Sequence, residues 1–319
     1  MPERFVVAIG EVLAEIMALD PGRGFREPIR LVGPFPSGAP AIFLDQAAKM
    51  GTACGMISCV GKDDFGLLNV ERLRNDGVDV SAIAVHPEAA TGTAFVRYRD
   101  DGSRDFVFNI RHSACGRIQL DAAARVLLAR ATHLHVMGSS LYAPEVVNTT
   151  RKAIGIVKAK GGTVSFDPNI RKEMLGHEGV REALEYALSE ADLFLPSGEE
   201  LLLFTKSRNE RRAIDEILEG GVRAVVMKRG AAGASYFDRS EDIHVSGCPV
   251  AEIDPTGAGD CFGATFVSCW LSGKSPADAL RFANASGAIA VSRKGPMEGT
   301  STRAEVLEFL AGADAREGL

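Results

Sequence analysis

The sequence predicts an α/β fold, in which helices flank a mostly parallel central sheet and a small β-sheet lid is added. Two observations predict this fold. Short apolar runs that end in small residues or aspartate alternate with segments of helical period over most of the 319 residues, as in a series of βαβ units. One stretch interrupts this alternation with two adjacent strand patterns and a tight turn, which is typical of an antiparallel hairpin.

The alternating segments give the elements of the central sheet in order. The expected strands are Phe5–Ile9, Gly55–Val60, His133–Met137, Thr163–Asp167, Leu193–Leu195 and Ala224–Lys228. Helices are expected between them at Ala41–Met50, Asp64–Asp76, Leu120–Ala129, Pro144–Lys160, Val180–Ala191 and Asn209–Glu219. Short Gly/Pro turns separate three further helices, Gly259–Leu271, Pro276–Arg293 and Thr302–Leu310. This order favours a doubly wound sheet.

The interruption consists of Thr93–Arg99 and Arg104–Ile110, which flank an Asp-Asp-Gly-Ser turn at 100–103. The stretch from Asp20 to Gly38 is rich in proline and glycine, and it predicts either another strand pair or a loop beside the hairpin. We therefore expect a single domain over 1–319, with a β lid formed by about 12–38 and 91–113.

Charge and composition exclude several classes of protein. A net charge of −6 gives no basic surface to neutralise a phosphate backbone, so no nucleic-acid partner is expected. No segment approaches the roughly 20 apolar residues of a membrane-spanning helix, and the N-terminus does not read as a signal peptide. The six cysteines lie far apart without a CxxC pair, which indicates neither a zinc site nor a disulfide framework. We expect a cytoplasmic protein with no membrane contact.

The densest chemical signal is the segment Asp254-Pro-Thr-Gly-Ala-Gly-Asp260, which leads directly into a helical run. Small residues let the backbone N–H groups of Gly257, Ala258 and Gly259 point toward one spot, and the helix that follows adds positive dipole potential. The segment therefore predicts an anion pocket at a helix N-terminus.

An aspartate in such a loop would repel a bound phosphate unless its carboxylate had a task. If a substrate hydroxyl lay between Asp260 and a transferred phosphoryl group, the carboxylate could accept the hydroxyl proton while the loop amides stabilised the phosphoryl oxygens. The alternative is a plain turn in which Asp260 caps the helix. The three small residues together with the flanking Asp254 and Thr256 favour the catalytic interpretation.

The segment DPTGAGDCF resembles the signature D-T-x-G-A-G-D-x-F of the ribokinase-like, or PfkB-type, carbohydrate kinases. Similar motifs follow the family's order over roughly residues 5 to 310, at 10–11, 37–41, 60–66, 77–79, 167–171, 197–200 and 228–233. The hairpin exit at 106–114 is similar to that of the members acting on fructose, tagatose or 2-keto-3-deoxygluconate. The resemblance implies a ribokinase-like, three-layer Rossmann-like kinase domain with a β lid that closes over sugar and pairs in a homodimer.

The resemblance also implies site residues. It assigns the catalytic base to Asp260 and the anion hole to Gly257, Ala258 and Gly259. It assigns ATP binding to Ser197, Lys228, Gly230, Gly233, Thr256 and Asn284, and the position of Mg²⁺ to Glu200, whose carboxylate suits a hard cation. A monovalent cation such as K⁺ is implied as a further cofactor near the Asp254 loop. Ordinary surface positions are the alternative for Glu200, Lys228 and Asn284.

On the sugar side the resemblance assigns, together with Asp260, the substrate residues Glu11, Glu15, Gly38, Ala39, Arg111, Asn169 and Arg171. Arg111 and Arg171 could each bind a carboxylate or hydroxyls in a bidentate manner, with ordinary surface arginines as the alternative. Three positions depart from the family pattern: Glu15 replaces an aspartate, Ile42 replaces an asparagine, and Ser197 replaces the asparagine of the N-x-x-E motif.

The leading hypothesis is an ATP-dependent kinase that phosphorylates a terminal hydroxyl of a ketose or a 2-keto-3-deoxy sugar acid. A nucleoside kinase of the same family and a sensor that binds sugar or nucleotide without turnover are the alternatives. A dinucleotide-dependent oxidoreductase would also fit the βαβ order, but the first strand is followed by Gly10-Glu11-Val12-Leu13 and not by GxGxxG.

Overall fold

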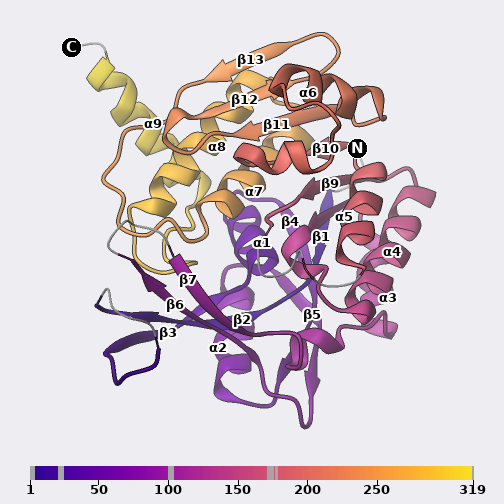
Figure 1. Ribbon diagram of the computed structural model, residues 1–319, viewed down its shortest axis with the longest axis vertical. Coiled ribbons are helices and arrows are strands. Elements are labelled where there is room, and N and C mark those ends of the chain that lie inside the picture. The colour runs from indigo at the N-terminus through magenta and orange to yellow at the C-terminus, as the bar shows by residue number, and fades with distance from the viewer. Residues whose placement is uncertain (1–3, 21–24, 100–103, 171–175, 177–178, 318–319) are drawn as a thin grey trace.

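A nine-stranded sheet forms the centre of the computed structural model, which describes residues 4–20, 25–99, 104–170, 176 and 179–317 (Figure 1). From one edge to the other, the strands are β13 (Asp242–Val245), β12 (Ala234–Phe237), β11 (Ala224–Lys228), β10 (Leu193–Phe194), β9 (Thr163–Asp167), β8 (His133–Met137), β1 (Phe5–Ile9), β4 (Ala53–Gly61) and β5 (Asp79–His86). The strands from β11 to β5 are parallel, whereas β12 and β13 form an antiparallel edge.

Two layers of helices cover the two faces of this sheet. One layer contains α1 (Ala39–Lys49), α2 (Asp64–Asn75), α7 (Ala258–Leu271), α8 (Pro276–Val291) and α9 (Arg303–Glu317). The other contains α3 (Ala122–Arg130), α4 (Pro144–Ala159), α5 (Val180–Ser189) and α6 (Glu210–Glu219). Strand β1 serves both cores by alternation, because Phe5, Val7 and Ile9 pack into one core and Val6 and Ala8 into the other.

A second sheet, the lid sheet, has the strand order β3-β2-β6-β7 and lies beside the α/β body (Figure 1). Its strands are β2 (Leu13–Ala18), β3 (Leu31–Ser37), β6 (Gly92–Tyr98) and β7 (Arg104–Asn109). Strands β6 and β7 form the antiparallel pair that the sequence predicts, and β2 joins β6 in parallel and β3 in antiparallel orientation. The proline-rich segment therefore supplies one strand of a pair, and the turn at 100–103 lies outside the described residues.

The secondary-structure predictions are confirmed for the six expected central strands and all the expected helices. Their ends agree within two residues, except that α9 continues to Glu317. The sequence did not predict strand β5 at one edge of the sheet, or the antiparallel strands β12 and β13 at the other. Strands β12 and β13 have four residues each, and only one of the eight residues of β5 is buried, so none shows the long apolar run of a central strand.

The parallel strands decide where ligands can bind, because side chains that follow their carboxyl ends gather at one edge of the sheet. Glu11 follows β1, Ser139 follows β8, Asn169 follows β9 and Ser197 follows β10. The N-terminus of α7 lies at the same edge, since Asn169 contacts Asp260 there. Among the described residues, no helix is both long and apolar enough to cross a membrane.

Candidate active site

A cavity of about 570 Å³, the lid cavity, lies between the lid sheet and the carboxyl ends of the strands. Its wall contains most residues that the sequence assigned to catalysis and substrate, namely Glu11, Glu15, Gly38, Ala39, Arg111, Asn169, Gly257, Gly259 and Asp260. Arg171, which was assigned to the substrate as well, lies outside the described residues. Segments from both ends and the middle of the chain therefore meet at one cavity.

A second cavity of about 860 Å³, the α8 cavity, lies against α8 and the turn after β11. Seven of the residues assigned to the nucleotide or the anion hole line it: Ser197, Lys228, Gly230, Gly233, Ala258, Gly259 and Asn284. Ser197, Lys228, Pro255 and Gly259 line both cavities. Two ligands bound side by side would therefore meet beside the start of α7.

The start of α7 has the backbone shape that an anion pocket requires. Gly257 adopts a φ of 82°, and a Cβ atom there would lie only 2.4 Å from the carbonyl oxygen of Pro296, so no other residue fits. Asp260 follows in the first turn of the helix, where backbone N–H groups lack helical partners. Asp260 is 6% exposed and lines the lid cavity.

Asn169 fixes the orientation of that carboxylate. Its Nδ2 atom donates to Oδ1 of Asp260 at 3.0 Å and to the sulfur of Met137 at 3.3 Å. Asn169 is also the only non-glycine residue in the described part of the chain with a positive φ, 38°, and its backbone N–H donates to Oδ1 of Asp167 at 3.1 Å. A left-handed residue held in this way is typical of a functional site.

Lys228 provides the positive charge of the site. Its Nζ atom forms an ion pair with Oδ2 of Asp167, and the two side chains are only 11% and 1% exposed. Burial alone would lower the pKa of Lys228, but the carboxylates of Asp167, Glu200 and Asp260 outweigh it and raise the pKa. The ammonium group therefore stays charged beside both cavities, where it could attract a phosphate.

Glu200 is held by backbone amides at the edge of the lid cavity. Its Oε1 accepts from the N–H of Ile170 and its Oε2 from the N–H of Ser197, each at 2.7 Å. Burial raises the pKa of Glu200, and the opposing charge of Lys228 limits the rise. The oxygens keep lone pairs for a cation or its waters. No group of three or more metal-ligating His, Cys, Asp or Glu side chains occurs among the described residues.

Two buried glutamates also line the lid cavity. Glu11 accepts hydrogen bonds from the hydroxyls of Ser139 (3.1 Å) and Ser140, and Glu15 accepts one from the hydroxyl of Ser37 at 3.0 Å. Both glutamates are less than 5% exposed. Their carboxylates are thus fixed in place where they can accept hydrogen bonds from a polyhydroxylated ligand.

Two nucleotide-side residues have structural tasks in addition to their place in the α8 cavity. Gly233, at φ 96°, lies so close to Val245 that a Cβ atom would meet its carbonyl oxygen at 2.1 Å. Asn284 donates from Nδ2 to the carbonyl oxygens of Val245 and Ser246, each at 3.0 Å. Asn284 therefore holds the 245–246 segment against α8, and Gly233 lets the same segment approach the turn before β12.

Thr256 lies elsewhere than the sequence analysis expected. It lines the lid cavity and not the α8 cavity, and its hydroxyl accepts from Nη1 of Arg104 at 2.9 Å. Arg104 itself was missed, as were Phe106 and Phe108, whose stacked rings line the same wall. The spacing of these three residues by two was the available signal, because alternate residues of a strand share one face.

Comparison with known proteins agrees with this geometry. Residues 3–303 match the family model of the pfkB family carbohydrate kinases. The chain is 32% identical over 316 residues to a 2-dehydro-3-deoxygluconokinase of Thermoproteus tenax, covering 96% of this chain and 94% of the relative.

Two solved structures are similar in fold as well as in sequence. An E. coli protein provisionally named Ribokinase II, in complex with ATP and Mg²⁺, is 50% identical, with a TM-score of 0.92 over 97% of this chain and 99% of that one. A fructokinase double mutant of Vibrio cholerae O395, with fructose, ADP and potassium ion bound, is 27% identical, with a TM-score of 0.82 over 97% and 99%. With the family match over nearly the whole chain, these similarities establish that the protein belongs to the PfkB family of carbohydrate kinases.

Proposed function

We propose that this kinase transfers the γ-phosphate of ATP to a terminal hydroxyl of a ketose or a 2-keto-3-deoxy sugar acid, with Asp260 as the general base. The position of Asp260 carries the proposal. Its carboxylate lines the lid cavity next to Gly259, which also lines the α8 cavity. A sugar in the lid cavity and ATP in the α8 cavity would therefore meet at this carboxylate.

The chain's own residues account for the steps of the transfer. The Asp260 carboxylate accepts the proton of the acceptor hydroxyl. As it does so, the hydroxyl oxygen bonds to the γ-phosphorus, and the bond from that phosphorus to the oxygen of ADP breaks. The first-turn N–H groups of α7, beginning at Gly257 and Ala258, stabilise the charge on the phosphoryl oxygens. Lys228 adds a fixed positive charge beside the junction of the cavities.

Two cations belong to the proposal. Mg²⁺ bound to ATP would neutralise charge on the phosphates, and sites of this kind add one or two protein carboxylates to the phosphate ligands. We assign that part to Glu200, whose carboxylate is held at the edge of the lid cavity. The K⁺ in the related Vibrio fructokinase supports a monovalent-cation site, which we place by the Asp254 loop.

The polar groups of the lid cavity support a substrate with several hydroxyls. The fixed carboxylates of Glu11 and Glu15 can accept from hydroxyls, whereas Arg104 and Arg111 supply guanidinium groups that suit a carboxylate. The relatives named for fructose and for 2-dehydro-3-deoxygluconate support the same two substrate classes.

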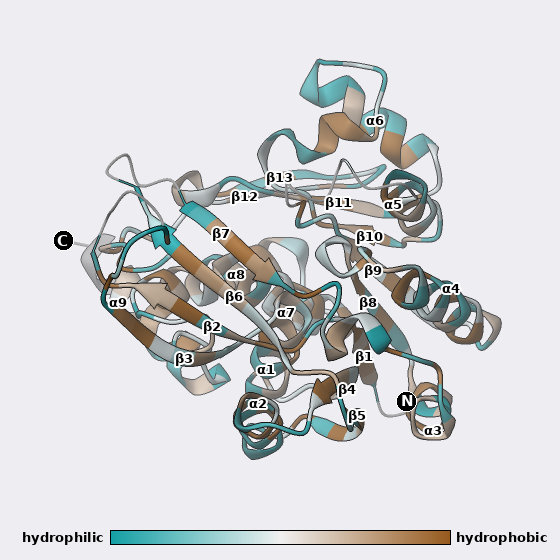
Figure 2. Ribbon diagram, turned by 60° about the horizontal axis from the view of Figure 1, so that its bottom comes forward, coloured by the Kyte–Doolittle hydropathy of each residue, from teal (hydrophilic) through white to brown (hydrophobic). Residues whose placement is uncertain are grey.

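We also propose a homodimer through the lid sheet. Glu15, Ala94, Phe106 and Phe108 line the cavity, so the alternate residues of these strands face away from it. In that outward row Ile16 lies opposite Phe95, and Phe95 lies opposite Val107, which is 47% exposed. Figure 2 shows apolar residues along β6 and β7, and a partner would remove this row from water.

The proposed function is tested by measuring ADP release and sugar phosphate formation with Mg-ATP over ketoses, 2-keto-3-deoxy acids and nucleosides. We expect transfer to at least one sugar or sugar acid. Asp260→Asn should lower turnover by about 10²–10⁴-fold while ATP still binds, because only the base is lost. Equal turnover by the variant and the parent would remove Asp260 from its role, and transfer to nucleosides alone would overturn the substrate class.

A further inference from the structure

Two lid residues hold the loop that precedes α7. The hydroxyl of Tyr98, at the end of β6, donates to Oδ1 of Asp254 at 2.5 Å, and Arg104, at the start of β7, donates to Thr256. Tyr98 and Arg104 are directly opposite each other in the β6–β7 ladder. The facing ends of β6 and β7 therefore contact two positions of the Asp254–Asp260 loop.

Asp254 also accepts hydrogen bonds from two backbone N–H groups, one in its own loop and one after α8. The residue is only 1% exposed; Oδ1 also accepts from the N–H of Thr256 at 3.0 Å, and Oδ2 accepts from the N–H of Gly295 at 2.9 Å. One carboxylate thus joins the segment before α7 to the segment after α8. Because a buried carboxylate depends on its hydrogen-bond donors, removal of one donor loosens the others.

The segment after α8 closes the link to the anion pocket. A Cβ atom on Gly295 would lie 2.9 Å from the ring of Phe35 in lid strand β3, so ring and glycine are packed directly together. The next residue, Pro296, lies with its carbonyl oxygen against Gly257, where a Cβ atom would meet it at 2.4 Å. Contacts therefore run without a gap from the lid sheet through 295–296 to the first amide position of the pocket.

We propose that Tyr98 is a positioning residue, which through Asp254 couples closure of the lid to the geometry of the amide loop. The inference rests on the proposed kinase function. While the lid is closed, the Tyr98 hydroxyl fixes Asp254 and with it the backbone around Gly257; when the lid opens, this donor leaves and the loop loses part of its support. Transfer of the phosphoryl group to water in the open enzyme is thereby disfavoured.

Tyr98 is well suited to test this coupling, because it does not line the lid cavity or the α8 cavity. Burial, followed by the hydrogen bond to Asp254, raises the pKa of Tyr98, so its hydroxyl remains a donor throughout the neutral range. Arg104 would be a poorer choice because it lines the lid cavity and could also contact substrate.

The experiment compares Tyr98→Phe with Tyr236→Phe, each of which removes one tyrosine hydroxyl. Tyr236, in β12, donates to Oδ2 of Asp238 at 2.8 Å and lines neither cavity, so it is a matched control. ADP release and sugar phosphate are measured together on the best acceptor. We expect Tyr98→Phe to lower kcat about tenfold, to change the KM for sugar by less than about threefold, and to raise the fraction of ADP formed without sugar phosphate.

A double-mutant cycle with Asp254→Asn separates coupling from a general loss of stability. If Tyr98 acts through Asp254, the Tyr98→Phe change should have little further effect on kcat in the Asp254→Asn background. Additive effects, or a Tyr98→Phe enzyme with the kcat and ADP-to-product ratio of Tyr236→Phe, would overturn the inference and leave the kinase function intact. A parent that phosphorylates no sugar would overturn both.

Discussion

The side-chain nitrogen Nδ2 of Asn169 lies 3.0 Å from Oδ1 of Asp260, although 91 positions separate the two residues in sequence. The family resemblance assigned Asn169 to the substrate, and in the structure its side chain contacts the proposed base. One oxygen of Asp260 is thereby oriented by a neutral donor. Asn169 therefore supports the ionised form of the carboxylate, because a hydrogen bond to the charged form favours that form.

Replacing Asn169 by aspartate should move the pH profile of the enzyme. Asn169→Asp puts a like charge beside Asp260, which raises the pKa of the base, and the base must be ionised to act. The acidic limb of kcat against pH should shift to higher pH, and turnover at neutral pH should fall. Asn169→Ala, which removes the donor without adding charge, is the control and should shift the limb by less. Superimposable profiles for the parent and Asn169→Asp would contradict an orienting role.

Lys228 should be needed for folding as well as for phosphate binding. In Lys228→Met the buried carboxylate of Asp167, 1% exposed, loses its ion-pair partner, and Glu200 loses the charge that limits the rise in its pKa. Breaking a buried pair from one side typically costs about 3–5 kcal/mol in the free energy of unfolding. Denaturant unfolding of the variant and the parent measures this loss.

Lys158→Met is the matched control for that measurement. Lys158 also forms an ion pair, with Glu190 at 2.7 Å, but the two side chains are 39% and 32% exposed. Exposed pairs contribute at most about 1 kcal/mol, so this variant should unfold almost as the parent does. If both variants lost a similar free energy of unfolding, burial would not make the Lys228–Asp167 pair more important for stability than an exposed pair.

Much of the fold follows from local sequence. The apolar runs of β1, β8 and β11 are buried on both faces of the sheet, so their sequences alone define them with the observed ends. The turn at Gly257 and the helix that follows it could also be predicted, because the shape of a glycine loop is a local property of the backbone. Strands β12 and β13 are defined by their antiparallel pairing with β11 and with each other, which local sequence does not reveal.

The contacts that complete the site are long-range, which is why sequence did not predict them. From the sequence, Asp254 could be recognised only as part of a motif, because its hydroxyl donor, Tyr98, lies 156 positions earlier in the chain. Asn169 reaches Asp260 because β9 ends next to the start of α7. The family resemblance assigned Thr256 to the nucleotide, but its residue lines the lid cavity.

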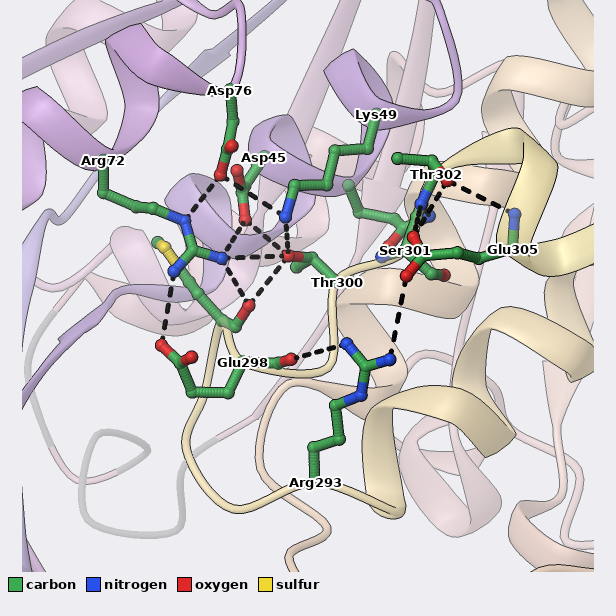
Figure 3. Close-up of polar contacts among 12 residues, drawn as sticks. Asp45, Lys49, Arg72, Asp76, Arg293, Glu298, Thr300, Ser301, Thr302 and Glu305 are labelled. Atoms are coloured by element: carbon green, nitrogen blue, oxygen red, sulfur yellow. Dashed lines mark hydrogen bonds and ion pairs between the residues drawn. The ribbon is translucent and has the colours of Figure 1, made fainter.

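A polar cluster away from the cavities predicts an unusual dependence of stability on pH (Figure 3). Asp45 is 0% exposed; its Oδ2 accepts from the hydroxyl of Thr300 at 2.7 Å and pairs with Arg72 at 3.3 Å. Burial first, and then a hydrogen bond with Asp76, raise the pKa of Asp45 to about 7, against the opposing charges of Lys49 and Arg72. In the unfolded chain its ordinary value is 3.8.

The sign of the effect follows from these two values. Protonated Asp45 stabilises the folded state fully below the unfolded pKa, and this contribution is lost as pH rises through the folded pKa of about 7. Asp45→Asn cannot ionise and keeps an oxygen for the Thr300 hydroxyl. Its free energy of unfolding should therefore rise relative to that of the parent from about pH 4 to about pH 7, by up to about 1.4 kcal/mol per unit of difference between the two pKa values.

Asp79→Asn is the control of opposite sign. Burial raises the pKa of Asp79, but hydrogen bonds from Ser81 and the ion pair with Arg130 outweigh burial and lower it. Its contribution is present above the unfolded pKa of 3.8 and is lost as pH falls below that value. Asp79→Asn should therefore lose stability relative to the parent only as pH rises toward about 4, and the difference should be constant above that pH. Urea unfolding at several pH values compares all three proteins, and a constant difference between Asp45→Asn and the parent would contradict the prediction.

The proposed dimer predicts that a charge on the outer face of the lid sheet separates the subunits. Val107→Asp introduces a carboxylate into the outward row of Ile16, Phe95 and Val107 at an exposed position, so the fold of the subunit should survive. Sedimentation should show a dimer for the parent and a monomer for the variant. Val126→Asp, at a 68% exposed position of α3, is the control and should sediment as the parent does.

Arg111 should distinguish the two proposed classes of substrate. It lines the lid cavity, and a guanidinium group binds a carboxylate through two charge-assisted hydrogen bonds but a hydroxyl less strongly. Arg111→Gln should therefore raise the KM for a 2-keto-3-deoxy acid about tenfold or more, and the KM for a neutral ketose far less. Arg117→Gln, at an exposed position that does not line the cavity, controls for the loss of a surface charge. Equal changes in KM for both substrates would mean that Arg111 does not read the acid group, whereas a selective change would make the carboxylate of the sugar the feature that this side of the cavity recognises.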